Sequence, residues 1–135
     1  MLKVIVVKED GFISVEEVCN DLEDIGKVIG TDMVEVVRPA ISIELGILPE
    51  DVRILCDEDA CFKNSKHNSI ATVLYSGGIN LRDFIAGTVI LCKYDKYGIS
   101  SLPDDYIEFI SCSLKCIKEG LEYNDLLIID KTKSY

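Results

Sequence analysis

The stretch CDEDACFKNSKHNS, which begins at Cys56, gathers the side chains that metal sites and catalytic loops use. Cys56, Cys61 and His67 could supply three metal ligands, with Asp57 or Asp59 as a fourth. A C-x4-C spacing followed by one histidine, however, fits no familiar zinc site. The acidic run also lacks the later oxygen ligands and the glycine of a calcium loop. The sequence therefore predicts neither a metal nor another cofactor.

Covalent catalysis needs a nucleophile, a base and an orienting group close together. The six cysteines and the single histidine permit a Cys–His pair, but no local motif points to one. The chain contains no G-x-S-x-G, P-loop or Rossmann motif. The adjacent carboxylates of Asp104 and Asp105 are better explained by the start of a helix, whose dipole favours acids. We therefore expect a protein that is not an enzyme.

The chain is strongly acidic. Its 135 residues include 24 acidic and 14 basic side chains, which give a net charge of −10. Such a field repels phosphate backbones, so direct binding of nucleic acid is not expected. Two interpretations of the charge stay open. The acids either keep the surface soluble, or they recognise a partner with a basic groove, including by imitation of DNA.

Positive charge is concentrated in one segment of this acidic chain. Residues 61–100 carry 5 basic and 2 acidic side chains, whereas residues 1–60 carry 5 basic and 15 acidic ones. A small basic pocket on an acidic body suits a compact phosphate-bearing ligand better than a long polyanion. The alternative is that these basic side chains only solvate a loop.

The apolar periodicity predicts an α+β fold with a mainly antiparallel sheet and two amphipathic helices. The first helix is expected at about 14–29, because Ser14 and Glu17 have the spacing of a capping box. The second is expected at about 102–122, with Ser101 as its cap and a proline and two aspartates in its first turn.

Strands are expected where β-branched and apolar residues form short runs between turns. These runs are LKVIVVK, MVEVVRP, ISIEL, DVRILC, IATVLY and the segment from Thr88 to Lys93. A short strand at 126–130 and a polar tail complete the single domain, which spans residues 1–135.

No stretch of the sequence reaches the length of a membrane span, and the apolar run at the N-terminus is too short for a signal peptide. We therefore expect a protein of the cytoplasm with no membrane partner, whose cysteines stay reduced. Cys56, Cys92, Cys112 and Cys116 are interpreted as small core residues. Because 48% of the residues are hydrophobic, we also expect apolar surface to be buried between the subunits of a homo-oligomer.

Five short motifs occur in a characteristic order. They are GTDMVEVVRP (30–39), VRILCDEDACF (52–62), HNS (67–69), FIAGTVILC (84–92) and SLPDDYIEF (101–109). In this order the chain resembles a family of small proteins of unknown function encoded by phages and conjugative plasmids. Members of that family carry I-E-V-V, then C-N-E-E-G-K, then N-R, then I-A-G-T-F. The resemblance covers residues 1 to about 110.

The sequence departs from the family pattern at two places in the loop. The turn N-E-E-G is Asp57-Glu58-Asp59-Ala60 here, and the pair N-R is Asn68-Ser69. If the family's arginine holds an anion, Lys66 or Arg82 would have to replace it in this chain.

The resemblance implies a non-enzymatic protein of a mobile element that disarms host defence in the host cytoplasm. In the first mechanism, a homo-oligomer sequesters a small nucleotide immune signal without cleaving it, as a sponge. Such a site needs anion contacts and an aromatic ring for base stacking. Tyr75 and Phe84 are further aromatic candidates. The predicted ligand-binding residues are Phe62, Lys63, Lys66, Asn68, Ser69, Arg82, Gly87 and Thr88.

Two alternatives to the sponge remain open. In one, the acidic protein blocks a basic host defence nuclease or effector, as anti-CRISPR or anti-restriction inhibitors do, with DNA mimicry as one form. In the other, the protein hydrolyses the nucleotide signal. The charge of −10 favours the inhibitor, and the locally basic segment favours the sponge.

Overall fold

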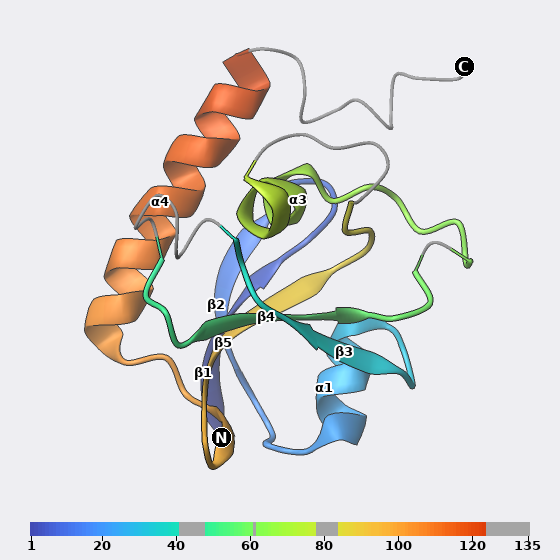
Figure 1. The fold of residues 1–135 in the computed structure, drawn as a ribbon, viewed down its shortest axis with the longest axis vertical. Helices are drawn as coiled ribbons and strands as arrows, with labels where there is room; N and C mark the ends of the chain where they lie inside the picture. The colour runs from blue at the N-terminus through green and yellow to red at the C-terminus, as the bar shows by residue number, and fades with distance from the viewer. Residues whose placement is uncertain (41–47, 61, 78–83, 124–135) are drawn as a thin grey trace.

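An antiparallel sheet forms the centre of the computed structural model, which describes residues 1–40, 48–60, 62–77 and 84–123 (Figure 1). Six strands belong to the sheet in this part of the chain, in the order β2-β1-β5-β4-β3, with β6 paired to β5. The strands are β1 (Leu2–Val7), β2 (Ile13–Val18), β3 (Val34–Val37), β4 (Val52–Asp57), β5 (Val89–Asp95) and β6 (Gly98–Ser100). The helices are α1 (Leu22–Ile29), α3 (Ser69–Ser76) and α4 (Asp104–Tyr123).

Helices cover both faces of the sheet. Figure 1 shows α3 and α4 next to each other and α1 well apart from them. Because successive residues of a strand point to opposite faces, β1, β4 and β5 each contribute to two apolar clusters. The larger cluster packs the sheet against α3 and α4 and contains Ile5, Val7, Ile54, Val89, Leu91, Ile70, Leu74, Ile110 and Leu114. The smaller cluster packs the sheet against α1 and contains Val4, Val6, Leu55, Ile90, Cys92, Ile25 and Ile29.

The predicted α+β class and antiparallel sheet are confirmed, but the first helix begins at Leu22 and not near residue 14. Residues 13–18 form β2, which pairs with β1 over its whole length. The proposed capping box is wrong, since the Ser14 hydroxyl donates to Glu16 Oε2 at 2.6 Å. The helix is capped instead by Asp21, whose Oδ1 accepts a 2.8 Å hydrogen bond from the backbone N–H of Asp24.

The run IATVLY, predicted as a strand, lies in α3. Asn68 caps the start of this helix, and Gly77, with φ of +80°, ends it in the left-handed conformation. These two caps outweigh the strand preference of the β-branched residues between them. The predicted strands at 41–45 and 126–130 lie outside the described residues.

The predicted C-terminal helix is confirmed as α4, although its start differs in detail. Ser101 does not cap it, because the Ser101 Oγ accepts a 2.9 Å hydrogen bond from the backbone N–H of Lys3. The carbonyl of Pro103 accepts the first helical hydrogen bond, from Ile107 N at 3.0 Å. None of the helices that the structure describes is long and apolar enough to cross a membrane.

The cysteines that the structure describes divide into buried and exposed ones. Cys56 and Cys92 are buried in the sheet, as predicted. Cys112 and Cys116 are exposed on α4, so their interpretation as core residues is wrong. The buried positions of α4 are Ile110, Leu114 and Leu121, and the two cysteines lie off this stripe.

Candidate functional site

Asn68 is a structural residue at the junction of three elements. Its side chain is 1% exposed. Nδ2 donates to the carbonyl oxygens of Val7, at 3.1 Å, and Gly87, at 2.8 Å, while Oδ1 accepts from the backbone N–H of Ala71 at 3.1 Å. Both amide donors and one acceptor are therefore used inside the protein. Asn68 joins the end of β1, the start of α3 and the segment before β5, so it is not available to a ligand.

His67 and Thr72 extend this buried polar junction. The Nε2 of His67 lies 3.2 Å from the Thr72 hydroxyl, and its ring makes an edge contact with Phe84 at 4.7 Å between centroids. The Thr72 Oγ1 also accepts from the backbone N–H of Ile85 at 3.0 Å. Asn68 N in turn donates to Ile85 O at 2.8 Å. The motifs HNS and FIAG, separate in the sequence, are thus held together by hydrogen bonds.

Lys63 is neutralised by a buried carboxylate. Its Nζ lies 3.0 Å from Asp57 Oδ2, and Asp57 is buried at the end of β4. Burial alone would raise the pKa of Asp57, but hydrogen bonds from Thr31, Lys63 and the Asp59 N–H, together with the lysine charge, outweigh it and lower the pKa. Lys63 is therefore committed to an ion pair that orders the loop.

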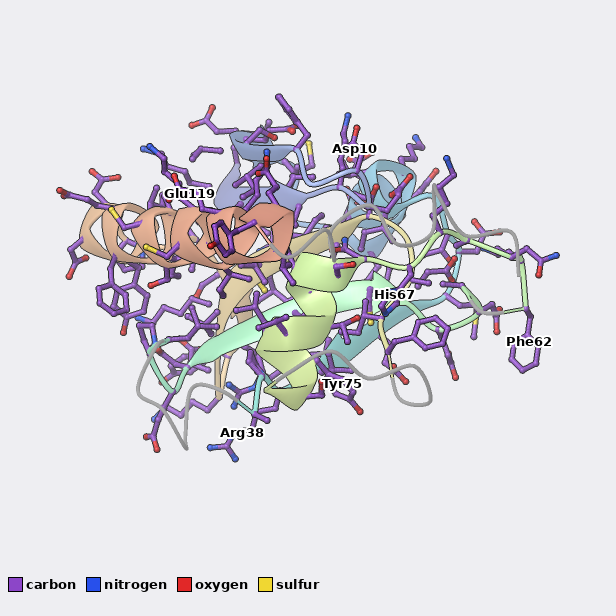
Figure 2. The ribbon with its side chains drawn as sticks, turned by 90° about the horizontal axis from the view of Figure 1, so that it is seen from above. Asp10, Arg38, Phe62, His67, Tyr75 and Glu119 are labelled. Atoms are coloured by element: carbon purple, nitrogen blue, oxygen red, sulfur yellow. The ribbon has the colours of Figure 1, made fainter. Side chains whose placement is uncertain are left out.

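The other predicted ligand residues lie around this junction without converging on one point. Ser69 is buried in the first turn of α3. Phe62 is 88% exposed, and Figure 2 shows it projecting from the end of its loop, away from His67 and Tyr75. Lys66 is exposed, although its carbonyl oxygen accepts a 2.8 Å hydrogen bond from Gly87 N.

A further predicted position, Thr88, contacts an acid. The Thr88 hydroxyl donates to Glu9 Oε2 at 3.1 Å, which places an acid next to the predicted anion contact. Arg82 lies outside the described residues.

The lysines of the basic segment are separated by the length of β5. Lys63 and Lys66 lie near its start, because Lys66 O bonds to Gly87 N. Lys93 lies within β5 near its far end and Lys96 just beyond it, about 20 Å or more away at the usual rise of a strand. Lys93 also pairs with Asp51 at 3.8 Å. The basic segment therefore forms no single patch among the described residues.

A cavity that the sequence did not predict lies between β3 and α3. Its volume is about 200 Å³. Its lining includes two aromatic rings, two exposed carboxylates, one thiol and one valine, which belong to Tyr75, Phe84, Glu35, Glu58, Cys56 and Val37. Only the pairing of β3 with β4 brings Glu35 opposite Cys56, and nothing in the sequence specifies that register.

A larger and shallower hollow of about 530 Å³ lies beside α1. Lys27 and Lys63 both line it, but Lys27 lies 3.8 Å from Glu23 and 3.7 Å from Asp24, and Lys63 pairs with Asp57. Its cations are therefore already matched by acids.

The described residues contain no group of three or more histidine, cysteine, aspartate or glutamate side chains arranged to hold a metal ion. Burial raises the pKa of Cys56 to about 12, and the charges of Glu35 and Asp57 act in the same direction. Cys56 is thus a neutral thiol near neutral pH and not an activated nucleophile.

Comparison with known proteins gives a family but no function. Residues 2–115 match the family described as Domain of unknown function (DUF3846). No curated protein matches the chain, and no solved structure does. Because the match spans most of the chain, the protein belongs to the DUF3846 family.

Proposed function

We propose that this protein acts by binding and that its acidic surface engages a basic protein. The observation that carries the proposal is the charge of residues 9–35, which hold nine acidic side chains and a single lysine, Lys27. None of these acids is buried. They lie on β2 and β3, which are at opposite ends of the strand order, on α1, and in the turns before and between these elements.

Three lysines described near this surface are occupied by other contacts. Lys27 lies within 3.8 Å of Glu23 and within 3.7 Å of Asp24, on its own helix. Lys3 pairs with Asp104 at 3.0 Å, and Lys8 lies over the ring of Phe12. The acids of β2 and β3 therefore keep their charge available to a partner.

A surface of this kind steers association with a basic partner and repels nucleic acid. Proteins that handle nucleic acid present grooves rich in lysine and arginine. The resemblance to phage and plasmid proteins suggests a host defence nuclease or effector in the host cytoplasm as the partner. The protein would then be an inhibitor that occupies the partner's basic groove.

A pulldown with two matched charge-reversal variants tests this proposal. One variant carries Glu16→Lys, Glu17→Lys and Glu23→Lys on the acidic surface. The control carries Glu108→Lys, Glu119→Lys and Glu122→Lys on α4, with the same change in net charge. We expect the first variant to lose a partner that the control retains. Equal recovery with both variants would contradict the proposal.

Capture of a small nucleotide signal by a homo-oligomer is the second candidate. One observation favours it: Tyr75 and Phe84, which could stack on a base, line a cavity whose neighbouring loop carries Lys63 and Lys66. Calorimetry against cyclic nucleotides and cyclic ADP-ribose isomers tests this candidate. The absence of heat across that panel would eliminate it.

A further inference from the structure

We infer that the cavity between β3 and α3 is a guanidinium pocket that receives an arginine side chain of the basic partner. This inference rests on the proposed binding function and specifies the chemistry of one anchor point within it.

The strand register turns the side chains of β3 toward α3. Glu35 pairs with Cys56, and Val37 pairs with Ile54, across the β3–β4 ladder. Cys56 and Ile54 belong to the cluster under α3, and side chains of directly paired residues share a face. Glu35 therefore lies at the edge of the sheet on the face that carries α3, where it lines the cavity.

Two carboxylates of the cavity have no cation partner among the described residues. Glu35 accepts a long contact of 4.0 Å from the Cys56 thiol, and the side chain of Glu58 is exposed. The neighbouring lysine, Lys63, is paired with Asp57. In Figure 2, Arg38 and His67 lie on opposite sides of Tyr75. The ring of His67 contacts Phe84, which lines the cavity.

The aromatic walls and the volume fit a guanidinium group. Tyr75 and Phe84 offer ring faces on which a planar cation stacks, and a carboxylate accepts two parallel hydrogen bonds from its fork. At about 200 Å³, the cavity is smaller than a drug-sized site of roughly 300–1,000 Å³. It suits a single side chain better than a dinucleotide.

The same features discriminate between ligands. A lysine ammonium is more strongly hydrated and lacks the planar fork, so it gains less from stacking. A nucleotide would bring phosphate groups toward Glu35 and Glu58, which repel them. Phe84 is held in place by its edge contact with His67, so one wall is already ordered before binding.

Nuclear magnetic resonance of the ¹⁵N-labelled protein tests the inference. Three probes are titrated separately: N-acetyl-arginine amide, N-acetyl-lysine amide and adenosine monophosphate. We expect saturable shifts with the arginine probe at backbone amides around Glu35, Cys56 and Phe84. Glu35→Gln should weaken this binding about tenfold, as the loss of a charged hydrogen bond implies. The control Glu119→Gln, on the exposed side of α4, should leave it unchanged.

The outcomes separate this inference from the proposed function. Equal binding of the arginine and lysine probes, or shifts only at residues away from the cavity, would overturn the assignment of a guanidinium pocket. The charge-reversal pulldown would still test whether the acidic surface binds a basic protein. Saturation of the cavity by adenosine monophosphate would also overturn it, in favour of nucleotide capture. If Glu35→Gln lowers the unfolding temperature, Glu58→Gln provides the same test from the other carboxylate.

Discussion

The side-chain Nδ2 of Asn68 donates a 2.8 Å hydrogen bond to the carbonyl oxygen of Gly87, and this contact joins the start of α3 to the segment that enters β5. Both residues were predicted as ligand contacts. They lie in contact, but their hydrogen bond holds the fold together.

We expect Asn68→Ala to lower the free energy of unfolding by about 3 kcal/mol, because it removes a helix cap and two further hydrogen bonds, to the carbonyl oxygens of Val7 and Gly87. Urea denaturation measures the loss. The matched control is Asp21→Ala, which removes an exposed cap and should cost about 1 kcal/mol. Equal effects of the two variants would mean that the contacts of Asn68 to Val7 and Gly87 contribute little.

We expect Gly87→Ala to destabilise the protein by about 1 kcal/mol, because Gly87 has φ of +81° and an alanine is strained there. Gly120 lies inside α4 with open space around the position of a new Cβ. Gly120→Ala should therefore stabilise by about 0.5–1 kcal/mol through helix propensity. Thermal unfolding of both variants checks the opposite signs, and a shared sign would contradict the assigned backbone conformations.

The pair of Asp57 and Lys63 should make stability depend on pH in the acidic range. The pKa of Asp57 is lowered in the folded protein from its ordinary value of 3.8. Its contribution is therefore complete above about pH 4 and is lost as the pH falls through the folded pKa. We expect Lys63→Ala to cost about 1 kcal/mol at neutral pH and little once Asp57 is protonated.

The control for this pH dependence is Lys66→Ala, which removes a lysine that is exposed in the same loop. Urea denaturation of both variants at neutral and at acidic pH measures the difference. An equal loss from Lys63→Ala at both pH values would show that the ion pair is not the source of its effect.

Thiol alkylation should distinguish the cysteines of the sheet from those of α4. Burial raises the pKa of Cys56 and of Cys92 to about 12, whereas Cys112 and Cys116 are exposed. Because the thiolate is the reactive form, we expect Cys56 and Cys92 to react at least about a hundredfold more slowly with iodoacetamide. Peptide mapping by mass spectrometry measures each rate, and unfolding in urea should abolish the difference. Rapid labelling of Cys56 in the folded protein would contradict its burial.

The strands with continuous apolar runs were predictable because burial on both faces leaves a recognisable pattern, as in LKVIVVK and VRILC. The segment around Val15 and Val18 was not, since their i, i+3 spacing fits one face of a helix, whereas in β2 Val15 is exposed and Val18 is buried. Pairing with β1 decides between the two, and that pairing is tertiary. For α3, the caps at Asn68 and Gly77 were present in the sequence, but Asn68 was interpreted as a ligand contact.

The candidate site was harder to predict than the fold. Loop residues and Gly87 were predicted to belong to one ligand site, and Gly87 N does donate a 2.8 Å hydrogen bond to Lys66 O. The sequence did not indicate that Lys63 is paired with Asp57 or that β5 separates the lysines. The cavity depends on the register of Glu35 and Cys56, which short-range patterns do not encode.

The outer strands of the described sheet, β2 and β3, have a consequence for aggregation. Both carry exposed glutamates, Glu16 and Glu17 on β2 and Glu35 on β3. A second copy that added its strand to either edge would bring like charges together, so these acids protect a valine-rich sheet from edge-to-edge growth. A basic partner that neutralises them would remove this protection. We therefore expect the sheet to be more prone to self-association in the complex, after charge neutralisation, than in the free protein.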